Sequence, residues 1–133
     1  MKIMDTSIND FIIPAAYELT GNISGSFICR GETSYENFVW DTELYKGSIP
    51  TKTEVMTKAQ ELFDKEAMRR LRIERDNLLA RTDWVVTKAS ETGVAETDAW
   101  KEYRQALRDL PLTSTPELDG PSIKNVTWPT IPS

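Results

Sequence analysis

The protein has 133 residues, a net charge of −5, no histidine and one cysteine, Cys29. This inventory excludes histidine-based acid/base catalysis, an internal disulfide and a thiolate metal site. The negative charge also weighs against nucleic-acid binding, because contact with phosphates needs clustered Lys and Arg. No apolar run reaches the roughly 20 residues of a membrane span, and the first residues lack a signal-peptide pattern. We expect a folded protein made in a cytoplasm, with no cofactor, no metal, no nucleic-acid partner and no membrane partner.

The first fifty residues contain short apolar clusters separated by turn formers, in the order FIIPAAYEL, TGNISG and SFICRGETSYENFVWD. Phe38, Val39 and Trp40 favour strands, while the Gly-containing stretches are typical of turns. We therefore predict a strand-rich module over residues 1–50, a small β-hairpin or meander of about two to four strands. Cys29 falls in one of these strands, where we expect a small buried hydrophobe rather than a reactive thiol.

A long helix is predicted next, from about Thr51 to about Ala80. Thr51 and Glu54 have the T-x-x-E spacing in which side chain and backbone cap each other at a helix start, and Pro50 stands just outside. No Gly or Pro interrupts the segment, which is rich in good helix formers. Its acidic and basic residues recur at i, i+4, so we expect a solvated, self-paired face rather than a nucleic-acid contact.

A second, shorter helix is predicted after the polar stretch TKASETGVAETD, residues 87–98, which we interpret as a turn region. Thr97 or Asp98 can cap the start of this helix, since short polar side chains accept hydrogen bonds from the first free N–H groups. We expect Pro111 to end it, because proline lacks the N–H that the next helical hydrogen bond needs.

One face of this second helix is apolar, and it consists of Trp100, Tyr103, Leu107 and Leu110. The spacing i, i+3, i+7, i+10 is that of a core stripe. We expect it to pack antiparallel against Leu71, Leu78 and Leu79, which gives a helical hairpin over residues 51–110.

The end of the chain changes in composition, because five of its seven prolines lie in residues 111–133. Such a segment cannot continue a helix, and we predict an extended Pro-rich tail, part linker and part docking strand. Trp128, which precedes Pro129, is its anchor: packing back onto the helical hairpin is favoured over a partner contact. The whole is predicted to be an α+β fold in which the three segments form one compact unit.

The two helices differ in length, and this difference raises the question of a partner. A helix over residues 51–80 is about 45 Å long, whereas residues 98–109 span about 18 Å. The shorter helix therefore leaves the beginning of the longer one uncovered, and the apolar residues there are Val55, Met56, Leu62 and Phe63. A contiguous apolar stripe of this kind marks an interaction surface. The N-terminal module, a second copy of the chain in a homo-oligomer, or a different protein can cover it, and the sequence leaves the three alternatives open.

Three segments in the C-terminal half resemble the phage tail assembly chaperones, small bacteriophage proteins related to tail-fibre assembly proteins. The segments are RDNLLARTDWVV (residues 75–86), DAWKEYRQALRDLP (residues 98–111) and VTWPTIP (residues 126–132). The residues that match the family pattern are Arg75, Asp76, Leu78, Leu79, Thr82, Asp83 and Trp84; then Trp100, Tyr103, Arg104, Gln105, Leu107, Arg108, Asp109 and Pro111; then Trp128, Pro129 and Pro132. The first fifty residues resemble the variable N-terminal parts of such proteins only loosely.

The resemblance implies non-enzymatic work in the construction of a phage tail or tail fibre. Its partner would be a tail or tail-fibre subunit in the cytoplasm of the infected host, and the alternative is a permanent structural or adaptor subunit of the tail in the virion. An enzyme using paired carboxylates is disfavoured, because the sequence has no phosphate loop and no nucleophile signature. Partner contacts are expected at Val55, Met56, Leu62, Phe63 and Trp128, and the core of the family motifs at Leu78, Leu79, Trp84, Trp100, Tyr103 and Leu107.

Overall fold

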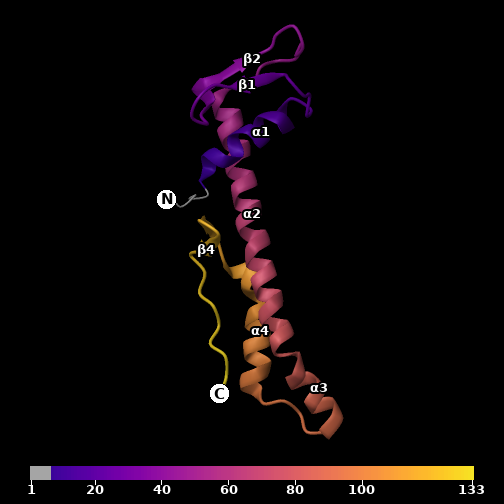
Figure 1. Ribbon diagram of the computed structural model, residues 1–133. Helices are drawn as coiled ribbons and strands as arrows, with labels where there is room; N and C mark the ends of the chain where they lie inside the picture. The colour runs from indigo at the N-terminus through magenta and orange to yellow at the C-terminus, as the bar shows by residue number, and fades with distance from the viewer. Residues whose placement is uncertain (1–6) are drawn as a thin grey trace. The chain divides into compact units, whose positions relative to one another are not determined.

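The computed structural model describes residues 7–133, and its class is α+β, as the sequence predicts (Figure 1). The elements are η1 (Ile8–Phe11), α1 (Ile12–Leu19), β1 (Phe27–Cys29), η2 (Tyr35–Asn37), β2 (Phe38–Trp40), α2 (Lys52–Arg81), α3 (Asp83–Thr92), α4 (Asp98–Thr113), β3 (Glu117–Asp119) and β4 (Ser122–Lys124).

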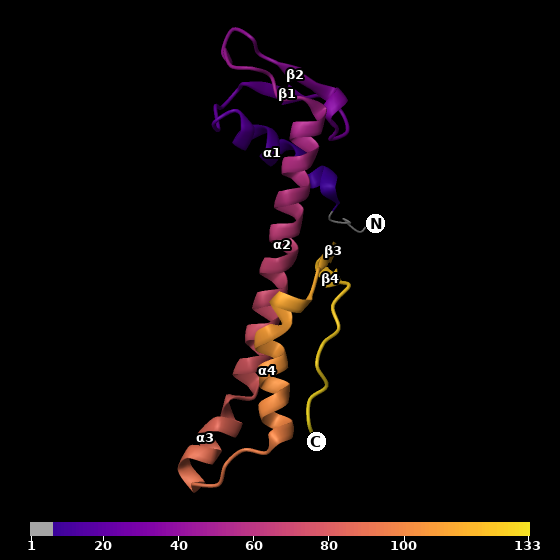
Figure 2. The ribbon, with the colours of Figure 1, turned by 180° about the vertical axis from the view of Figure 1, so that it is seen from behind.

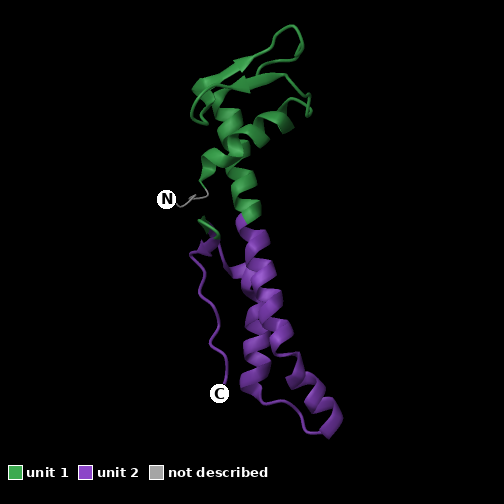
Figure 3. Cartoon of the chain, in the orientation of Figure 1, with its two compact units in different colours: residues 1–66, 118–121 green, residues 67–117, 122–133 purple. Residues whose placement is uncertain are grey.

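The chain forms two compact units, which Figure 3 distinguishes by colour. Unit 1 comprises the described residues up to Glu66 together with Leu118–Pro121, and unit 2 comprises Ala67–Glu117 and Ser122–Ser133. The boundary thus falls inside α2, whereas the composition of the sequence changes near residues 50 and 110.

The apolar cluster FIIPAAYEL forms helix α1 rather than part of a strand module, so the sequence-based interpretation was wrong at this segment. Ala15 and Ala16 have no exposed surface, and their small side chains let the helix backbone lie close to the core. Pro14 stands in the first turn, where its missing N–H costs no hydrogen bond. The helix stops at Thr20, and the left-handed φ of 72° at Gly21 turns the chain away.

The expected hairpin of the N-terminal region is confirmed, with two strands. Strands β1 and β2 are antiparallel, and Ile28 faces Val39 in the register. The strands alternate in burial: Phe27 and Phe38 are buried on one face, while Ile28 and Val39 are exposed on the other. The buried face packs on α1 and on the beginning of α2, and the rings of Phe27 and Phe38 stack at 4.8 Å.

The long helix α2 has 30 residues, which is about 45 Å, and it begins where the sequence predicts. The capping box forms: the Thr51 N–H donates to the Glu54 carboxylate over 2.8 Å, and the Glu54 N–H donates to the Thr51 hydroxyl over 3.2 Å. The predicted pairing of its charges is present at Glu61 and Lys65, whose charged atoms lie 3.1 Å apart.

Helix α3 occupies the first half of the segment that we interpreted as a turn, so that interpretation was wrong for residues 87–92. Hydroxyl groups of Thr87 and Thr92 donate to carbonyl oxygens one turn earlier, which keeps these polar residues helical. Gly93 adopts a left-handed φ of 70° and ends α3. Only residues 93–97 connect α3 to α4, and Figure 2 shows this connection from behind.

Helix α4 runs two residues past Pro111, to Thr113, so the prediction that this proline ends the helix was wrong by a short margin. The ring of Pro111 removes the N–H that would donate to the Leu107 carbonyl. That loss falls in the last turn, where the helix is about to end in any case. Thr97 is the N-cap residue, one of the two predicted alternatives, but its side chain makes no capping hydrogen bond, so the predicted side-chain cap was wrong. Its carbonyl accepts from the Lys101 N–H over 3.1 Å, which is the first hydrogen bond of the helix.

The tail is not simply extended, because β3 and β4 form a second two-stranded sheet within it. Gly120, with a φ of 58°, lies in the tight turn between these strands. The residues after Lys124 have no regular secondary structure.

Candidate docking site

The outer face of the β1–β2 hairpin is apolar and open to solvent. Ile28 is 51% exposed and Val39 46% exposed, and they lie opposite each other in the register. We call this pair the hairpin face. It exists because the other residues of both strands point into the core of unit 1, so period-2 alternation leaves these two outside.

The backbone of β1 also has an unused edge. Hydrogen bonds from the Arg30 N–H to the Asn37 carbonyl and from the Asp41 N–H to the Ser26 carbonyl flank the hairpin. In an antiparallel pair the bonded residues alternate, so the N–H and C=O groups of Phe27 and Cys29 point away from β2. No third strand lies beside β1 in the part of the chain that the structure describes. This edge can pair with a strand from another protein.

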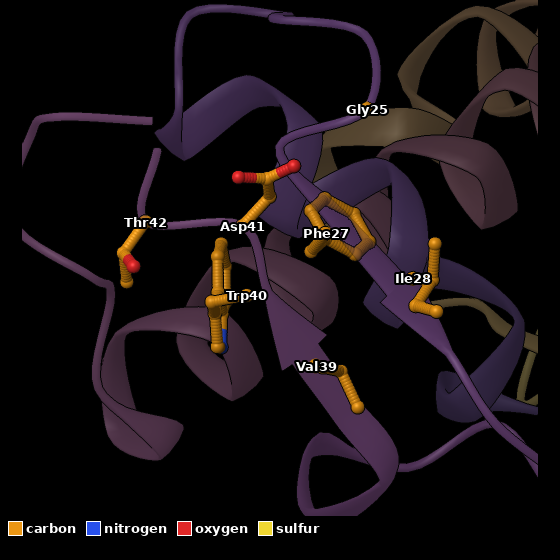
Figure 4. Close-up of a pocket in the computed structure, with 7 residues that line it drawn as sticks. All are labelled: Gly25, Phe27, Ile28, Val39, Trp40, Asp41 and Thr42. Atoms are coloured by element: carbon orange, nitrogen blue, oxygen red, sulfur yellow. The ribbon is translucent and has the colours of Figure 1, made fainter. Parts of the chain in front are cut away.

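A pocket of about 370 Å³ opens on the hairpin, and Figure 4 shows its walls. Its lining consists of Gly25, Phe27, Ile28, Val39, Trp40, Asp41 and Thr42. Side chains from both strands and from the turn after β2 surround it, and the carboxylate of Asp41 is its one charged group. This volume lies within the range of pockets that bind small molecules.

Hydrogen bonds within the turn after β2 hold it in place, and this turn forms one wall of the pocket. One carboxylate oxygen of Asp41 accepts hydrogen bonds from the N–H groups of Glu43 and Leu44, each over 3.0 Å. Leu44 then lies against Gly25, where an added Cβ would meet its Cδ2 at 3.1 Å. Gly25 has a φ of 82°, which favours glycine.

Ion pairs of unit 1 involve lysines of α2, and one of them connects α1 to α2. The Lys58 ammonium lies 3.1 Å from a carboxylate oxygen of Glu18 and 3.3 Å from one of Glu61. Hydrogen bonding to Glu18, and then to Glu61, raises the pKa of Lys58. Hydrogen bonds from Lys65 and Lys58 lower the pKa of Glu61. Lys52 likewise bonds Glu36 and lowers the pKa of that carboxyl.

Four of the residues expected to contact a partner lie at the beginning of α2, inside unit 1. Val55 has no exposed surface and belongs to the same cluster as Ile12 and Phe27, while Met56 and Leu62 are half-buried against that cluster. The ring of Phe63 meets Phe11 edge to face at 5.9 Å. The first of the three alternatives therefore holds here, since the N-terminal segment covers this stripe. A partner contact at these residues stays a prediction.

Trp128, the fifth residue expected to contact a partner, is half-buried in the tail after β4. Its role stays a prediction as well.

The residues expected in the core of the family motifs differ in how deeply they are buried in unit 2. Leu107 has no exposed surface and Tyr103 is 6% exposed, whereas Leu78, Leu79 and Trp100 are half-buried. Trp84 is 54% exposed, and its ring contacts Trp100 edge to face at 5.7 Å. Trp100 in turn meets Tyr103 at 6.0 Å, so the three aromatic rings form a chain from α3 onto α4.

Arg104 on α4 connects the two motifs, and the sequence analysis did not identify it as a buried residue. One Nη atom donates to the Leu79 carbonyl over 2.9 Å and to the Thr82 hydroxyl over 2.7 Å. The other Nη lies 2.8 Å from the Asp83 carboxylate. Leu79 and Thr82 lie at the end of α2, where the last carbonyls lack the usual i+4 partner. The Leu79 carbonyl accepts from the Thr82 N–H and from the Thr82 hydroxyl, each over 3.1 Å, and Arg104 adds a charged donor to it. The signal in the sequence was that Thr82, Asp83 and Arg104 all match the same family pattern.

Among residues 7–133, no three acidic or cysteine side chains come together in a way that could hold a metal ion. The helices of the same residues include none that is both long and apolar enough to cross a membrane.

One comparison with known proteins gives a match. A family model described as phage tail assembly chaperone protein matches residues 68–133, which begin inside α2 and include α3, α4, β3, β4 and the tail. No curated protein and no solved structure matches the chain.

Proposed function

Because the C-terminal half of this chain, residues 68–133, belongs to the phage tail assembly chaperone family, we propose that the protein binds a tail or tail-fibre subunit during assembly, and that the β1–β2 hairpin is the docking element. The protein acts by binding alone, without catalysis. It works in the cytoplasm of the infected host, where tail subunits are made before they assemble.

The free edge of β1 beside the hairpin face is the observation that carries this proposal. An unassembled fibre or tail subunit exposes strand edges, and such edges pair wrongly with one another. A chaperone strand that pairs with one of them blocks that pairing, and main-chain hydrogen bonds supply the affinity. Ile28 and Val39 add apolar contact on one side of the joined sheet.

The short strands of the hairpin support a transient rather than a permanent contact. Each strand has three residues, so a joined strand gains only a few main-chain hydrogen bonds, each worth about 0.5–1.5 kcal/mol net. The bound subunit can therefore leave when its own assembly partner arrives. The alternative, a permanent subunit of the tail, requires the chain in purified virions, and detecting it there in stoichiometric amount would contradict the transient role.

Co-expression with the tail-fibre subunit tests the proposal. We expect the yield of soluble, trimeric fibre to rise several-fold with the protein present, and to fall back with Val39→Glu, since a charge on the hairpin face opposes apolar contact. Leu112→Glu is the matched control, because Leu112 is 87% exposed on α4 and lies outside the hairpin. Equal fibre yields with and without the protein would end the proposal.

A further inference from the structure

A second pocket lies in unit 2, between α3, the connection after it and the beginning of α4. Its volume is about 240 Å³. Its apolar wall includes Trp84, Val85, Ala89, Val94 and Trp100. The residues that form it come from both sides of the connection over residues 93–97, which Figure 1 shows at the end of α3.

One residue that lines the pocket, Glu96, has a buried carboxylate oxygen, Oε2, without a hydrogen-bond partner among residues 7–133. Glu96 also lines a second hollow together with Lys101, Arg104 and Arg108, and none of these three residues bonds that oxygen. A buried acceptor that stays unpaired costs about 1–3 kcal/mol, and more when it is charged. Lys88 also lines the pocket, but it is exposed, and among residues 7–133 it does not bond the Oε2 of Glu96. A donor from outside would remove the cost.

The aromatic residues beside Glu96 indicate which donor fits. Trp84 and Trp100 meet edge to face, with their ring centres 5.7 Å apart, so two indole rings border one small space. The face of tryptophan attracts a cation more strongly than any other side chain does. A cation that contacts an indole ring and a carboxylate gains from both, through the ring quadrupole and through a charge-assisted hydrogen bond.

We infer that this pocket, which we call the indole pocket, binds an arginine side chain of a partner protein. The volume suits a single side chain, and the planar guanidinium stacks on an indole while donating to a carboxylate. The net charge of −5 draws a basic segment to the protein. Trp84 is exposed, and its ring gives the partner apolar contact around the charge. This inference does not depend on the hairpin, which belongs to unit 1.

Binding can be tested with the pentapeptide acetyl-Ala-Ala-Arg-Ala-Ala-amide as the probe and with the unaltered full chain. The probe is titrated while the indole N–H signals of Trp84 and Trp100 are followed by NMR. We expect both signals to shift along one saturating curve. The same peptide with citrulline, which has nearly the shape of arginine and no charge, should bind at least about tenfold more weakly.

Two variants localise the site. Glu96→Gln removes the charge and should weaken binding about tenfold, whereas Glu91→Gln removes an exposed charge of α3 outside the lining and should bind as the unaltered chain does. Circular dichroism of each variant checks folding, and if Glu96→Gln does not fold, the citrulline comparison on the unaltered chain decides. Equal binding of the arginine and citrulline peptides, unchanged binding by a folded Glu96→Gln, or no saturable shift at either indole would overturn the inference.

Discussion

Replacing Arg104 by methionine should destabilise unit 2 through one identifiable loss. The Arg104 side chain is 9% exposed, so its hydrogen bonds to the Leu79 carbonyl and the Thr82 hydroxyl are shielded from water. Hydrogen bonds to a charged group contribute about 1.5–3 kcal/mol each. The ion pair adds little, because the Asp83 side chain is 64% exposed and exposed pairs contribute about 0–1 kcal/mol.

The net loss of stability should be smaller than the sum of these contributions, because Thr82 keeps other hydrogen-bond partners in the variant. Its hydroxyl also donates to the Leu78 and Leu79 carbonyls, at 3.3 and 3.1 Å. Without Arg104, the Leu79 carbonyl loses its charged donor and keeps its bond from the Thr82 hydroxyl. The methionine side chain recovers part of the buried apolar contact. We expect the free energy of unfolding to fall by about 2–4 kcal/mol, which is typical of a broken buried network.

Urea denaturation followed by circular dichroism measures this difference. Arg108→Met is the matched control, since Arg108 is exposed on the same helix and its side chain bonds Gln105 alone among residues 7–133, at 3.2 Å; its effect should stay within about 0.5 kcal/mol. Combining Arg104→Met with Thr82→Val should give an effect smaller than the sum of the two, because the pair interacts directly. A change below about 0.5 kcal/mol for Arg104→Met, the size of an ordinary surface effect, would refute the reasoning.

Three further predictions concern the core, a turn and the pH. Leu107→Ala should lower the free energy of unfolding by about 2–5 kcal/mol in urea denaturation, because the side chain has no exposed surface; Leu112→Ala, at a site 87% exposed, is the control. Gly25→Ala should cost more than about 1 kcal/mol by thermal denaturation, because φ is 82° and a leucine methyl would lie 3.1 Å from the new Cβ; a variant as stable as the original contradicts this. Stability from Glu61, whose pKa is lowered, is present above pH 4.5 and is lost as the pH falls through its folded pKa. Lys65→Gln, which removes the first cause of this shift, should therefore flatten the acid side of a plot of urea midpoint against pH, and an unchanged acid side would count against the Glu61–Lys65 pair.

The long helix could be predicted from sequence because local chemistry decides it. The T-x-x-E box at Thr51 forms as expected, and no Gly or Pro competes with the helix afterwards. The hairpin was also predictable, since strand-favouring residues flank glycine-containing turns. Which strand residues face outward depended on the packing of α1 and α2, so Ile28 and Val39 could not be recognised as a surface in advance.

The errors in the sequence analysis came from segments where tertiary packing overrides composition. Residues 12–19 are apolar and partly β-branched, but the two alanines fit a helix packed closely on the core. Residues 87–92 are polar, and their threonines remain helical by bonding back to the preceding turn. The buried position of Arg104 depends on a bend between α2 and α3 that no periodicity indicated.

Of the candidate docking residues, sequence reasoning found the apolar stripe at the beginning of α2 but not the element that covers it. Length alone showed that α4 is too short for α2, and the structure agrees: α4 has 16 residues against 30. In the structure, the N-terminal segment covers that stripe, and Val55 is fully buried. The apolar surface that stays exposed in unit 1 includes Ile28 and Val39 of the hairpin. We therefore propose that the partner binds there.

Hydrogen–deuterium exchange of the protein with and without the tail-fibre subunit tests the docking role of β1 most directly. The N–H groups of Phe27 and Cys29 point away from β2, so they should exchange quickly in the free protein and slow by at least about tenfold when a partner strand pairs with them. Complex formation without slower exchange at these two amides would contradict the account.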